Sequence, residues 1–312
     1  MEKRFEIYSK GKKKYVPSWE ISNTTIIAQG HLIKIAEIFD EYWGELDKLP
    51  NPEFVITELR LKKDKPDIFT FSQRVPNAKP KFNYHLEWRN YAVLPISTYE
   101  NWFQKQIPSS TRRNIRASEK RGITAQVSEY NEDYIRGIMS IYNESRVRQR
   151  RKFFHYGKSF EAVKKENGTY SERSTFFAAY YQNEIIGYQK IVWDKETAAI
   201  MQILSKMAHR DNRPNNALLA EAVRQCCQRG IKYLLYERFD YGTKTNDSLT
   251  QFKQNNGFVR MDIPRYYIPL TIKGDIAIRM KLYKGIKDRV PDQILKPLRD
   301  LRSKWYELRE TK

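Results

Sequence analysis

The sequence predicts an α+β protein whose central part forms a mixed β-sheet. Three strand-like segments follow one another between residues 176 and 204. The short polar turns Gln182–Asn183 and Asp194–Lys195 separate them, as in an antiparallel meander. A helix-like segment, residues 214–229, then leads into the apolar segment 231–236. Because a strand, a crossover helix and a further strand are typical of parallel pairing, we expect both kinds of pairing in one sheet.

Further elements are predicted around this meander, and their ends agree with the known preferences for caps. Pro214 suits the first turn of its helix because it needs no N–H there, and Gly230 suits the end. The other elements are a basic helix that starts at Ser109 or Ser110 and stops at Gly122, a strand at 123–128, a helix at 131–144, a short helix at 248–255 and an extended segment at 258–270.

The regions on either side are less regular. Residues 32–43 have helical apolar spacing, and residues 53–61 alternate like a half-buried strand. We therefore divide the chain into an α+β region at 1–104, a central domain at 105–272 and a basic helical tail at 273–312. The tail has apolar residues at helical spacing between Lys and Arg, which predicts packing against the domain or, alternatively, contact with an anionic membrane. These apolar residues are Leu295, Leu298, Leu301, Trp305 and Leu308.

Composition limits the classes of partner. The 312 residues carry a net charge of +20, which favours anionic partners: nucleic acid, anionic lipid or phosphorylated small molecules. With 40% hydrophobic and 13% aromatic residues, the chain is predicted to form a packed core and not to be disordered. The neighbours Cys226 and Cys227 cannot form a disulfide framework, and no group of His and Cys has the spacing of metal ligands.

The chain is expected to lie in the cytoplasm. Its first residues are charged and lack an apolar signal segment, and no apolar run is long enough to span a bilayer. Peripheral contact with the inner face of the membrane is a further expectation, because the surface is strongly basic.

Four motifs occur in a recognisable order. They are Arg113–Arg116 (RNIR), Arg213–Leu219 (RPNNALL), Gln228–Tyr233 (QRGIKY), and Leu249–Lys253 (LTQFK) followed by Gly257–Phe258. The series resembles the GNAT acyltransferase superfamily, in particular its Fem-type and polysaccharide-locus members. The resemblance implies transfer of an acyl group from acyl-CoA to an amine or hydroxyl of a cell-envelope or polysaccharide precursor. It also suggests that residues 1–104 are a degenerate half of the same kind.

The sequence departs from ordinary GNAT enzymes at the loop that binds the donor pyrophosphate. That loop is glycine-rich, so that backbone N–H groups at a helix start face the phosphates. Here Arg210 takes its first position, and Arg213 and Asn215 stand where glycines are expected. We therefore predict a clamp made by side chains. The residues predicted to bind the donor are Leu204, Arg210, Arg213, Asn215 and Asn216.

Candidate catalytic residues follow the buried strand at 231–236. Groups at the carboxyl end of such a strand face the ligand crevice. Glu237 or Asp240 could take the proton from the acceptor, and Tyr236 or Tyr241 could protonate the leaving group. The resemblance implies that Lys253 stabilises an oxyanion. The alternative for each residue is an ordinary polar strand end or surface position.

The segment 146–158 places basic residues beside aromatic ones, a pattern that can grip phosphates and stack rings. We predict that it binds an anionic or lipid-linked acceptor. The alternative is a solvated basic loop with Phe153 and Phe154 in the core. The predicted substrate-binding residues are Arg148, Arg151, His155, Tyr156 and Lys158.

Two alternatives to an acyl-CoA enzyme stay open. One is a Fem-type transferase that uses aminoacyl-tRNA, since a long polyanion suits the charge of the chain. The other is a non-catalytic module that binds RNA or an anionic membrane. A gap between the strands that contain Leu204 and Leu235 would favour the enzyme, whereas a closed sheet would favour the binding module.

Overall fold

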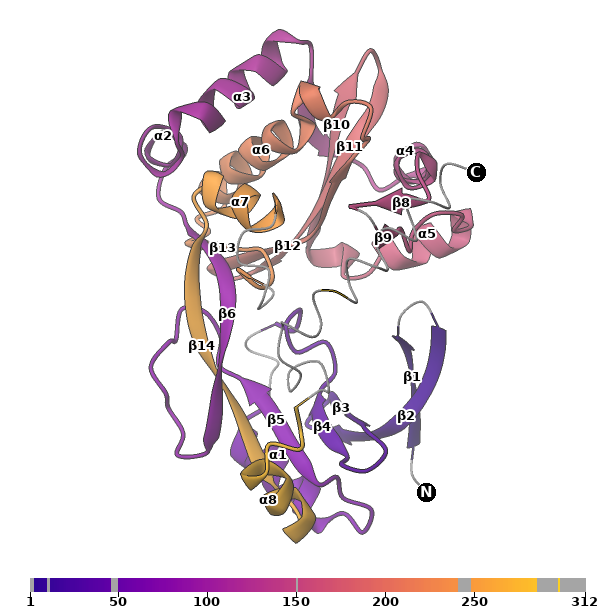
Figure 1. Ribbon diagram of the computed structural model, residues 1–312, viewed down its shortest axis with the longest axis vertical. Coiled ribbons are helices and arrows are strands. Elements are labelled where there is room, and N and C mark those ends of the chain that lie inside the picture. Colours follow the sequence, from indigo (N-terminus) through magenta and orange to yellow (C-terminus); the bar gives the residue numbers. More distant parts are fainter. Residues whose placement is uncertain are drawn as a thin grey trace. The chain divides into compact units, whose positions relative to one another are not determined.

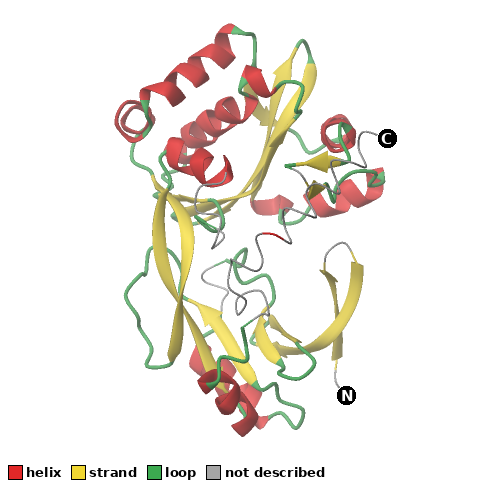
Figure 2. Ribbon diagram, viewed as in Figure 1, coloured by secondary structure: helices red, strands yellow, loops and turns green. Residues whose placement is uncertain are grey.

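The computed structural model describes residues 3–9, 12–45, 50–149, 151–240, 248–284 and 297. The described residues form two compact units: those up to Arg89 and from Asp262 onward make the first, and Asn90–Met261 make the second. The chain passes between the units twice, within strands β6 and β14 (Figure 1). Each unit combines a sheet with helices (Figure 2).

The second unit contains a mixed sheet in the order β6-β13-β12-β11-β10-β7. Strands β12 and β13 are parallel, and the pairs β13–β6, β12–β11, β11–β10 and β10–β7 are antiparallel. The predicted fold class is therefore confirmed. The strands are β6 (His85–Pro95), β7 (Thr124–Ser128), β10 (Ser174–Tyr181), β11 (Glu184–Asp194), β12 (Thr197–Ser205) and β13 (Tyr233–Leu235).

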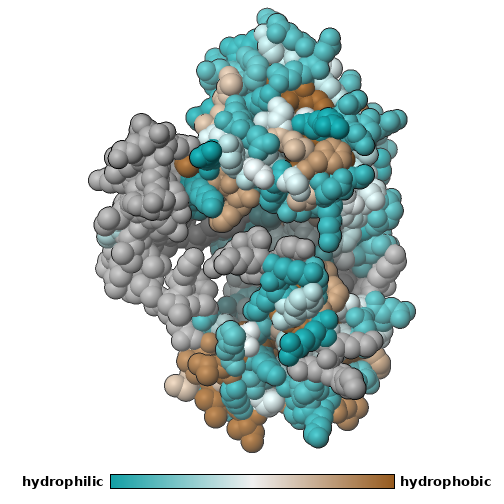
Figure 3. Space-filling view, turned by 90° about the vertical axis from the view of Figure 1, so that its right-hand side faces the viewer, coloured by the Kyte–Doolittle hydropathy of each residue, from teal (hydrophilic) through white to brown (hydrophobic). Residues whose placement is uncertain are grey.

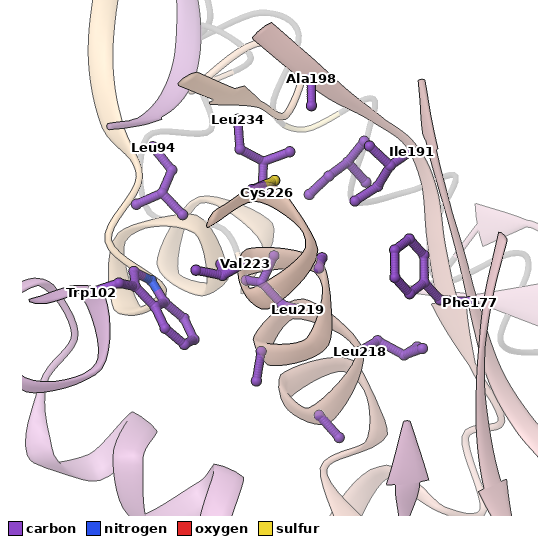
Figure 4. Close-up of a cluster of buried hydrophobic side chains, with 14 of the residues drawn as sticks. Leu94, Trp102, Phe177, Ile191, Ala198, Leu218, Leu219, Val223, Cys226 and Leu234 are labelled. Atoms are coloured by element: carbon purple, nitrogen blue, oxygen red, sulfur yellow. The ribbon is translucent and has the colours of Figure 1, made fainter. Parts of the chain in front are cut away.

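Helix α6 (Pro214–Gln228) covers one face of this sheet. Its apolar side, which includes Leu218, Val223 and Cys226, packs on Phe177 and Ile191 from the strands (Figure 4). Helix α3 (Ser109–Lys120) lies beside α6. Helices α4 (Glu132–Asn143) and α5 (Phe160–Asn167) pack against the other face, where a second core cluster forms.

Shorter elements complete the second unit. They are α2 (Tyr99–Asn101), a π-helical turn at Trp102–Gln106, the hairpin β8 (Val147–Arg148) and β9 (Arg151–Lys152), 3-10 turns at Ser171–Arg173 and Arg210–Asn212, and α7 (Ser248–Asn255).

The first unit has its own mixed sheet, in the order β1-β2-β3-β4-β5-β14, with β4 and β5 parallel. Helix α1 (Pro52–Leu61) connects these two parallel strands, and α8 (Ile272–Arg279) follows β14. The strands are β1 (Lys3–Ser9), β2 (Lys12–Ile21), β3 (Thr24–Gln29), β4 (Ile35–Ile38), β5 (Ile68–Ser72) and β14 (Val259–Pro269).

The two units repeat one order of elements: an antiparallel meander, a crossover helix and a parallel strand. In each unit, the strand that follows the parallel strand in sequence pairs with the parallel strand of the other unit. β6 follows β5 in sequence but pairs with β13, and β14 follows β13 but pairs with β5. The extended segment predicted at 258–270 is thus present, but residues 265–269 belong to the sheet of the first unit.

Two predictions for the N-terminal region are wrong. Residues 32–43 contain strand β4 and no helix, because Ala36 and Ile38 alternate into the core between β3 and β5. Residues 53–61 form helix α1 and no strand. Asn51 caps this helix by accepting from the Glu53 N–H, and Val55, Ile56 and Leu59 share its buried face. Helix α3 is confirmed, although Pro108 and not a serine occupies the cap position.

Candidate functional site

Strands β12 and β13 separate after a short parallel contact. They pair only from Thr197 and Tyr233 to Ala199 and Leu235, while β12 continues to Ser205. Beyond Leu235 the chain follows β6 on its other side: the Tyr236 N–H donates to Ala92 O, and Glu237 O accepts from the Ala92 N–H, both at 2.9 Å. The two strands thus separate beyond Leu235, and the ligand-admitting gap beside Leu204 and Leu235 stays a prediction.

A bulge in β12 lies at the same place. Lys190 of β11 pairs with Gln202 and Ile191 pairs with Ile200, which leaves Met201 as an extra residue in β12. Because a bulge bends its strand and increases the local twist, it turns the end of β12 away from β13, while β12 stays paired with β11.

A pocket of about 280 Å³ lies at the end of β12, beside Ser205 and the N-terminus of α6. Two of its lining residues are arginines and six are carboxamides, and the described part of its wall holds no carboxylate. Such a wall suits an anionic ligand with many hydrogen-bond acceptors. Its polar side chains are Thr111, Asn114, Ser205, Arg210, Arg213, Asn215, Asn216, Ser248, Gln251, Asn255 and Asn256.

Hydrogen bonds between helices hold this wall together. Asn216 of α6 lies 3.4 Å from Asn256, measured from Nδ2 to Oδ1. Thr111 of α3 donates to Asn255 O at 2.9 Å, and Trp102 Nε1 donates to Asn256 O at 3.1 Å. The three helices around the pocket are thus fixed to one another at its wall.

The start of α6 offers few backbone donors. Arg213 precedes the helix in the left-handed region, at φ 60° and ψ 40°. Its carbonyl accepts the N–H groups of Asn216, at 3.0 Å, and Ala217, at 3.4 Å, and Pro214 has no N–H. The buried Oδ1 of Asn215 has no hydrogen-bond partner among the described residues. An anion here would be held mainly by side chains.

Four of the five residues predicted to bind the donor lie together in this pocket: Arg210, Arg213, Asn215 and Asn216. Leu204 does not line it. Its side chain packs with the core cluster on the face covered by α4, and the next residue, Ser205, lines the pocket instead. Because successive side chains of a strand point to opposite faces, a shift of one residue changes the side.

The loop between β12 and Arg210 is held by Glu144 at the end of α4. Its Oε2 accepts from the Met207 N–H at 2.6 Å and its Oε1 from the Ala208 N–H at 2.8 Å. Nη2 of Arg148 lies 2.9 Å from the same Oε2. Glu144 thus fixes the path of the chain toward the pocket, and no motif in the sequence identified it.

The residues after β13 form a separate group. Asp240 is buried, and its Oδ2 lies 2.8 Å from Nη1 of Arg260. Asn90 accepts from the Asp240 N–H at 3.0 Å and places its Nδ2 3.5 Å from Oδ1. Glu237 is exposed and has a φ of 46°. Tyr241 lies outside the described residues.

Lys253 lies on the buried side of α7. Its ammonium group donates to Arg238 O and lies 4.6 Å from the centroid of the Tyr236 ring. Burial raises the pKa of Tyr236. The neighbours Gln251 and Phe252 line the pocket, whereas Lys253 ties α7 to the end of β13.

The predicted substrate-binding segment lies on the face of the sheet covered by α4 and α5. Arg148 is mostly buried and donates to Ser205 O and Ile141 O, both at 2.8 Å. Arg151 is exposed. The segment therefore reaches the end of β12 from the side opposite α6.

His155 and Lys158 form a small cluster in this segment. The His155 ring lies 4.4 Å from the Tyr142 ring, and burial together with the Lys158 cation lowers the pKa of His155 to about 4. Lys158 Nζ lies 2.5 Å from Glu166 Oε2. Tyr156 is exposed beneath the guanidinium of Arg146, at 5.3 Å.

Sequence reasoning missed the amide residues that α3 and α7 bring to the pocket. Asn114 belongs to the RNIR motif, and Gln251 lies beside Phe252 in the LTQFK motif. Both motifs served only to identify the family, so their polar side chains received no role. Their position in those motifs was the feature of the sequence that could have identified them as pocket residues.

Comparisons with known proteins agree with this geometry. Residues 109–254 match the family described as acetyltransferase (GNAT) domain. No curated protein matches the sequence. Among described helices, none is long and apolar enough to cross a bilayer.

Solved structures share the fold at low identity. The C-terminal domain of a putative lysylphosphatidylglycerol synthetase from Agrobacterium fabrum has a TM-score of 0.54 at 12% identity, over 82% of this chain and 84% of that chain. L-PGS from Bacillus licheniformis has a TM-score of 0.52 at 14% identity, over 85% and 88%. FemX has a TM-score of 0.49 at 9% identity, over 89% of each chain, below the value at which we infer a common fold. The resemblance carried by the four motifs is confirmed: residues 109–254 match the acetyltransferase (GNAT) domain family.

Proposed function

We propose that this protein transfers an acyl group from acyl-CoA to an amine or hydroxyl of an anionic cell-envelope or polysaccharide precursor. The observation that carries the proposal is the pocket at the start of α6, which lies at the end of β12, beyond the residues that pair with β13. A phosphorylated donor would place its anionic part in the pocket and extend its acyl arm into the gap between the strands.

The pocket fits the phosphate part of such a donor. Its volume of about 280 Å³ is just below the range of about 300–1,000 Å³ for small-molecule sites. It can hold a diphosphate but not a whole coenzyme A. Arg210 and Arg213 supply the positive charge, and the carboxamides supply N–H donors.

The acceptor would approach from the face covered by α4 and α5. Arg151 and Lys158 supply cations there, which supports an anionic precursor. His155 lies in the same cluster and is neutral at pH 7, because its pKa is lowered to about 4. A neutral imidazole can accept a proton.

The chemistry requires removal of a proton from the acceptor and protonation of the leaving thiolate, and no covalent enzyme intermediate. The acceptor attacks the acyl carbonyl, a carboxylate or a bound water takes the proton, and the thiol of CoA leaves. Glu237 and Asp240 stay the proposed bases, with Tyr241 as the proposed acid and Lys253 as the proposed oxyanion donor.

Calorimetric titration with acetyl-CoA tests the donor site. Arg210→Ala and Arg213→Ala should each weaken binding at least tenfold, while Arg136→Ala, at an exposed arginine on α4, should leave it unchanged. Binding that is unaffected by both pocket variants would show that the donor lies elsewhere.

A second candidate uses aminoacyl-tRNA as the donor. Two of the solved structures with TM-scores above 0.5 are named as a putative lysylphosphatidylglycerol synthetase and as L-PGS, and the net charge of +20 suits a polyanion. Titration with charged tRNA over a range of salt separates the candidates. Tight, salt-dependent tRNA binding without CoA binding would favour the second. Binding of RNA or vesicles with no acyl transfer from either donor would indicate a non-catalytic module.

A further inference from the structure

Helix α8 of the first unit exposes a row of large apolar side chains. Ile272 is 82% exposed, Ile276 49% and Met280, at the C-cap, 64%. Residues four positions apart lie above one another on a helix, so these three form one stripe. The opposite side, with Ala277 and Ile278, is buried in the unit. The stripe is therefore a surface of a packed helix and not the end of a frayed one.

The turn between β3 and β4 presents another apolar side chain, Leu32, which is 82% exposed. Gly30 shapes this turn at a φ of 112°, and a Cβ there would lie 2.0 Å from Ile33 O. The turn and the residues that follow α8 meet at a groove of about 720 Å³, which Leu32, Leu282 and Tyr283 help to line. We call Leu32, Ile272, Ile276, Met280 and Leu282 the apolar ridge.

Asp67 joins the two parts of the ridge. Its Oδ2 accepts from the Lys34 N–H at 2.8 Å, and its Oδ1 accepts from Thr271 Oγ1 at 2.9 Å. Thr271 also caps α8 by accepting from the Gly274 N–H. One buried carboxylate thus fixes the turn that carries Leu32 and the start of the helix that carries Ile272. The ridge is preformed.

Cations accompany the ridge. Lys273, Arg279 and Lys281 are exposed on or directly after α8. Two of them also pair with acids: Arg279 with Asp275 at 2.9 Å, and Lys273 with Asp67 at 3.5 Å. Figure 3 shows exposed hydrophobic surface, in brown, on the first unit. Apolar side chains in a row beside Lys and Arg are the combination that binds the interface of an anionic bilayer.

We propose that the apolar ridge docks the protein on a membrane with anionic headgroups. The ridge side chains enter the headgroup–acyl boundary, and Lys273, Arg279 and Lys281 contact lipid phosphates. The cations beside the ridge favour an anionic bilayer as the partner, because such a bilayer binds both the apolar and the cationic groups. This inference does not depend on which acyl donor the second unit uses.

Co-sedimentation with vesicles tests the proposal. The full chain should bind vesicles of equal parts phosphatidylglycerol and phosphatidylcholine at least tenfold more tightly than vesicles of phosphatidylcholine alone. Ile276→Ser/Met280→Ser should weaken binding to the anionic vesicles at least tenfold. Arg279→Gln/Lys281→Gln should remove most of the preference for phosphatidylglycerol. Thermal unfolding should be nearly unchanged, because the altered side chains are exposed.

The matched control is Phe54→Ser/Leu61→Ser, at exposed apolar residues of α1 in the same unit, and it should bind like the wild type. A fluorophore on Met280→Cys, with Cys227→Ser to remove the partly exposed native thiol, should shift to the blue on vesicles. Unchanged vesicle binding by Ile276→Ser/Met280→Ser would overturn the proposal. So would a wild-type dimer that this variant converts to a monomer, because the ridge would then be a subunit interface.

Discussion

Arg148 donates to Glu144 across 2.9 Å, and the same carboxylate holds the main-chain amides of Met207 and Ala208. The pair thus links the basic segment after α4 to the loop that leads into Arg210. Arg148, a residue predicted to bind substrate, thus contacts the carboxylate that holds the loop leading to the pocket.

Changing Glu144→Gln should damage donor binding more than folding. Glutamine keeps one acceptor but loses the charge, and hydrogen bonds to a charged group contribute about 1.5–3 kcal/mol. We expect the loop at 207–208 to loosen and the Kd for the donor to rise about tenfold, equivalent to about 1.4 kcal/mol. Calorimetry measures the Kd, and urea unfolding supplies the control. A drop in stability with unchanged donor affinity would contradict the positioning role.

Arg148→Ala and Arg151→Ala should behave differently although they are three residues apart. Arg148 is mostly buried against Glu144, and breaking a buried ion pair costs about 3–5 kcal/mol of unfolding free energy. Arg148→Ala should cost less than this, because the loop amides still pair with Glu144. Arg151 is exposed, so Arg151→Ala should leave stability within about 0.5 kcal/mol. If the segment binds the acceptor, Arg151→Ala raises the KM for the acceptor alone; an unchanged KM would favour the solvated-loop alternative.

Arg213→Gly should stabilise the fold and weaken donor binding at once. A non-glycine residue in the left-handed region costs about 1–2 kcal/mol, which glycine avoids. The variant also loses a guanidinium from the pocket. We expect a rise in the unfolding free energy of up to about 1 kcal/mol, since glycine has a more flexible unfolded state. Arg213→Ala keeps the backbone strain and should lose affinity without gaining stability. Equal donor affinity in all three proteins would exclude Arg213 from the site.

Asp240 can be tested as a base through its partner Arg260. Asp240→Asn and Arg260→Ala both remove the ion pair at 2.8 Å, so a purely structural Asp240 should give similar losses of stability and similar kcat values. A catalytic Asp240 should lose kcat by at least about 100-fold only in Asp240→Asn. Glu237→Gln supplies the comparison for the other proposed base. Full activity in both carboxylate variants would reject the two residues together.

His155 should make stability fall in mild acid. Burial and the Lys158 cation lower its pKa to about 4 in the folded protein, while the unfolded chain takes up a proton near pH 6.5. Between these values the unfolded state binds more protons, so stability rises with pH across this window. His155→Phe, which keeps a ring against Tyr142, should flatten the change between pH 7 and 5 in urea unfolding. Identical slopes in the variant and the wild type would contradict this.

The sequence predicted the elements at 109–144 and 176–255 because caps, turns and periodicity agreed there, but it missed the hairpin β8–β9 and helix α5 between them. It failed for residues 53–61, where the apolar spacing of Val55, Ile56 and Leu59 suits a helix but the segment is also rich in β-formers. The pocket was predicted in part. Arg210 and Arg213 were recognisable from their position before α6, whereas Asn256 enters through long-range packing that no local pattern encodes.

The exchange of β6 and β14 sets the shortest piece of this chain that can fold. A fragment limited to residues 105–272 would lack β6, so β13 would present a bare edge where Pro95 and Val93 now pair with it. It would also carry the end of β14 without the β5 that binds it. Such a fragment should aggregate or stay unfolded even though it contains every element of the pocket. The unit that holds the pocket should therefore be expressed, or transplanted into another protein, only together with its neighbour as one length of chain.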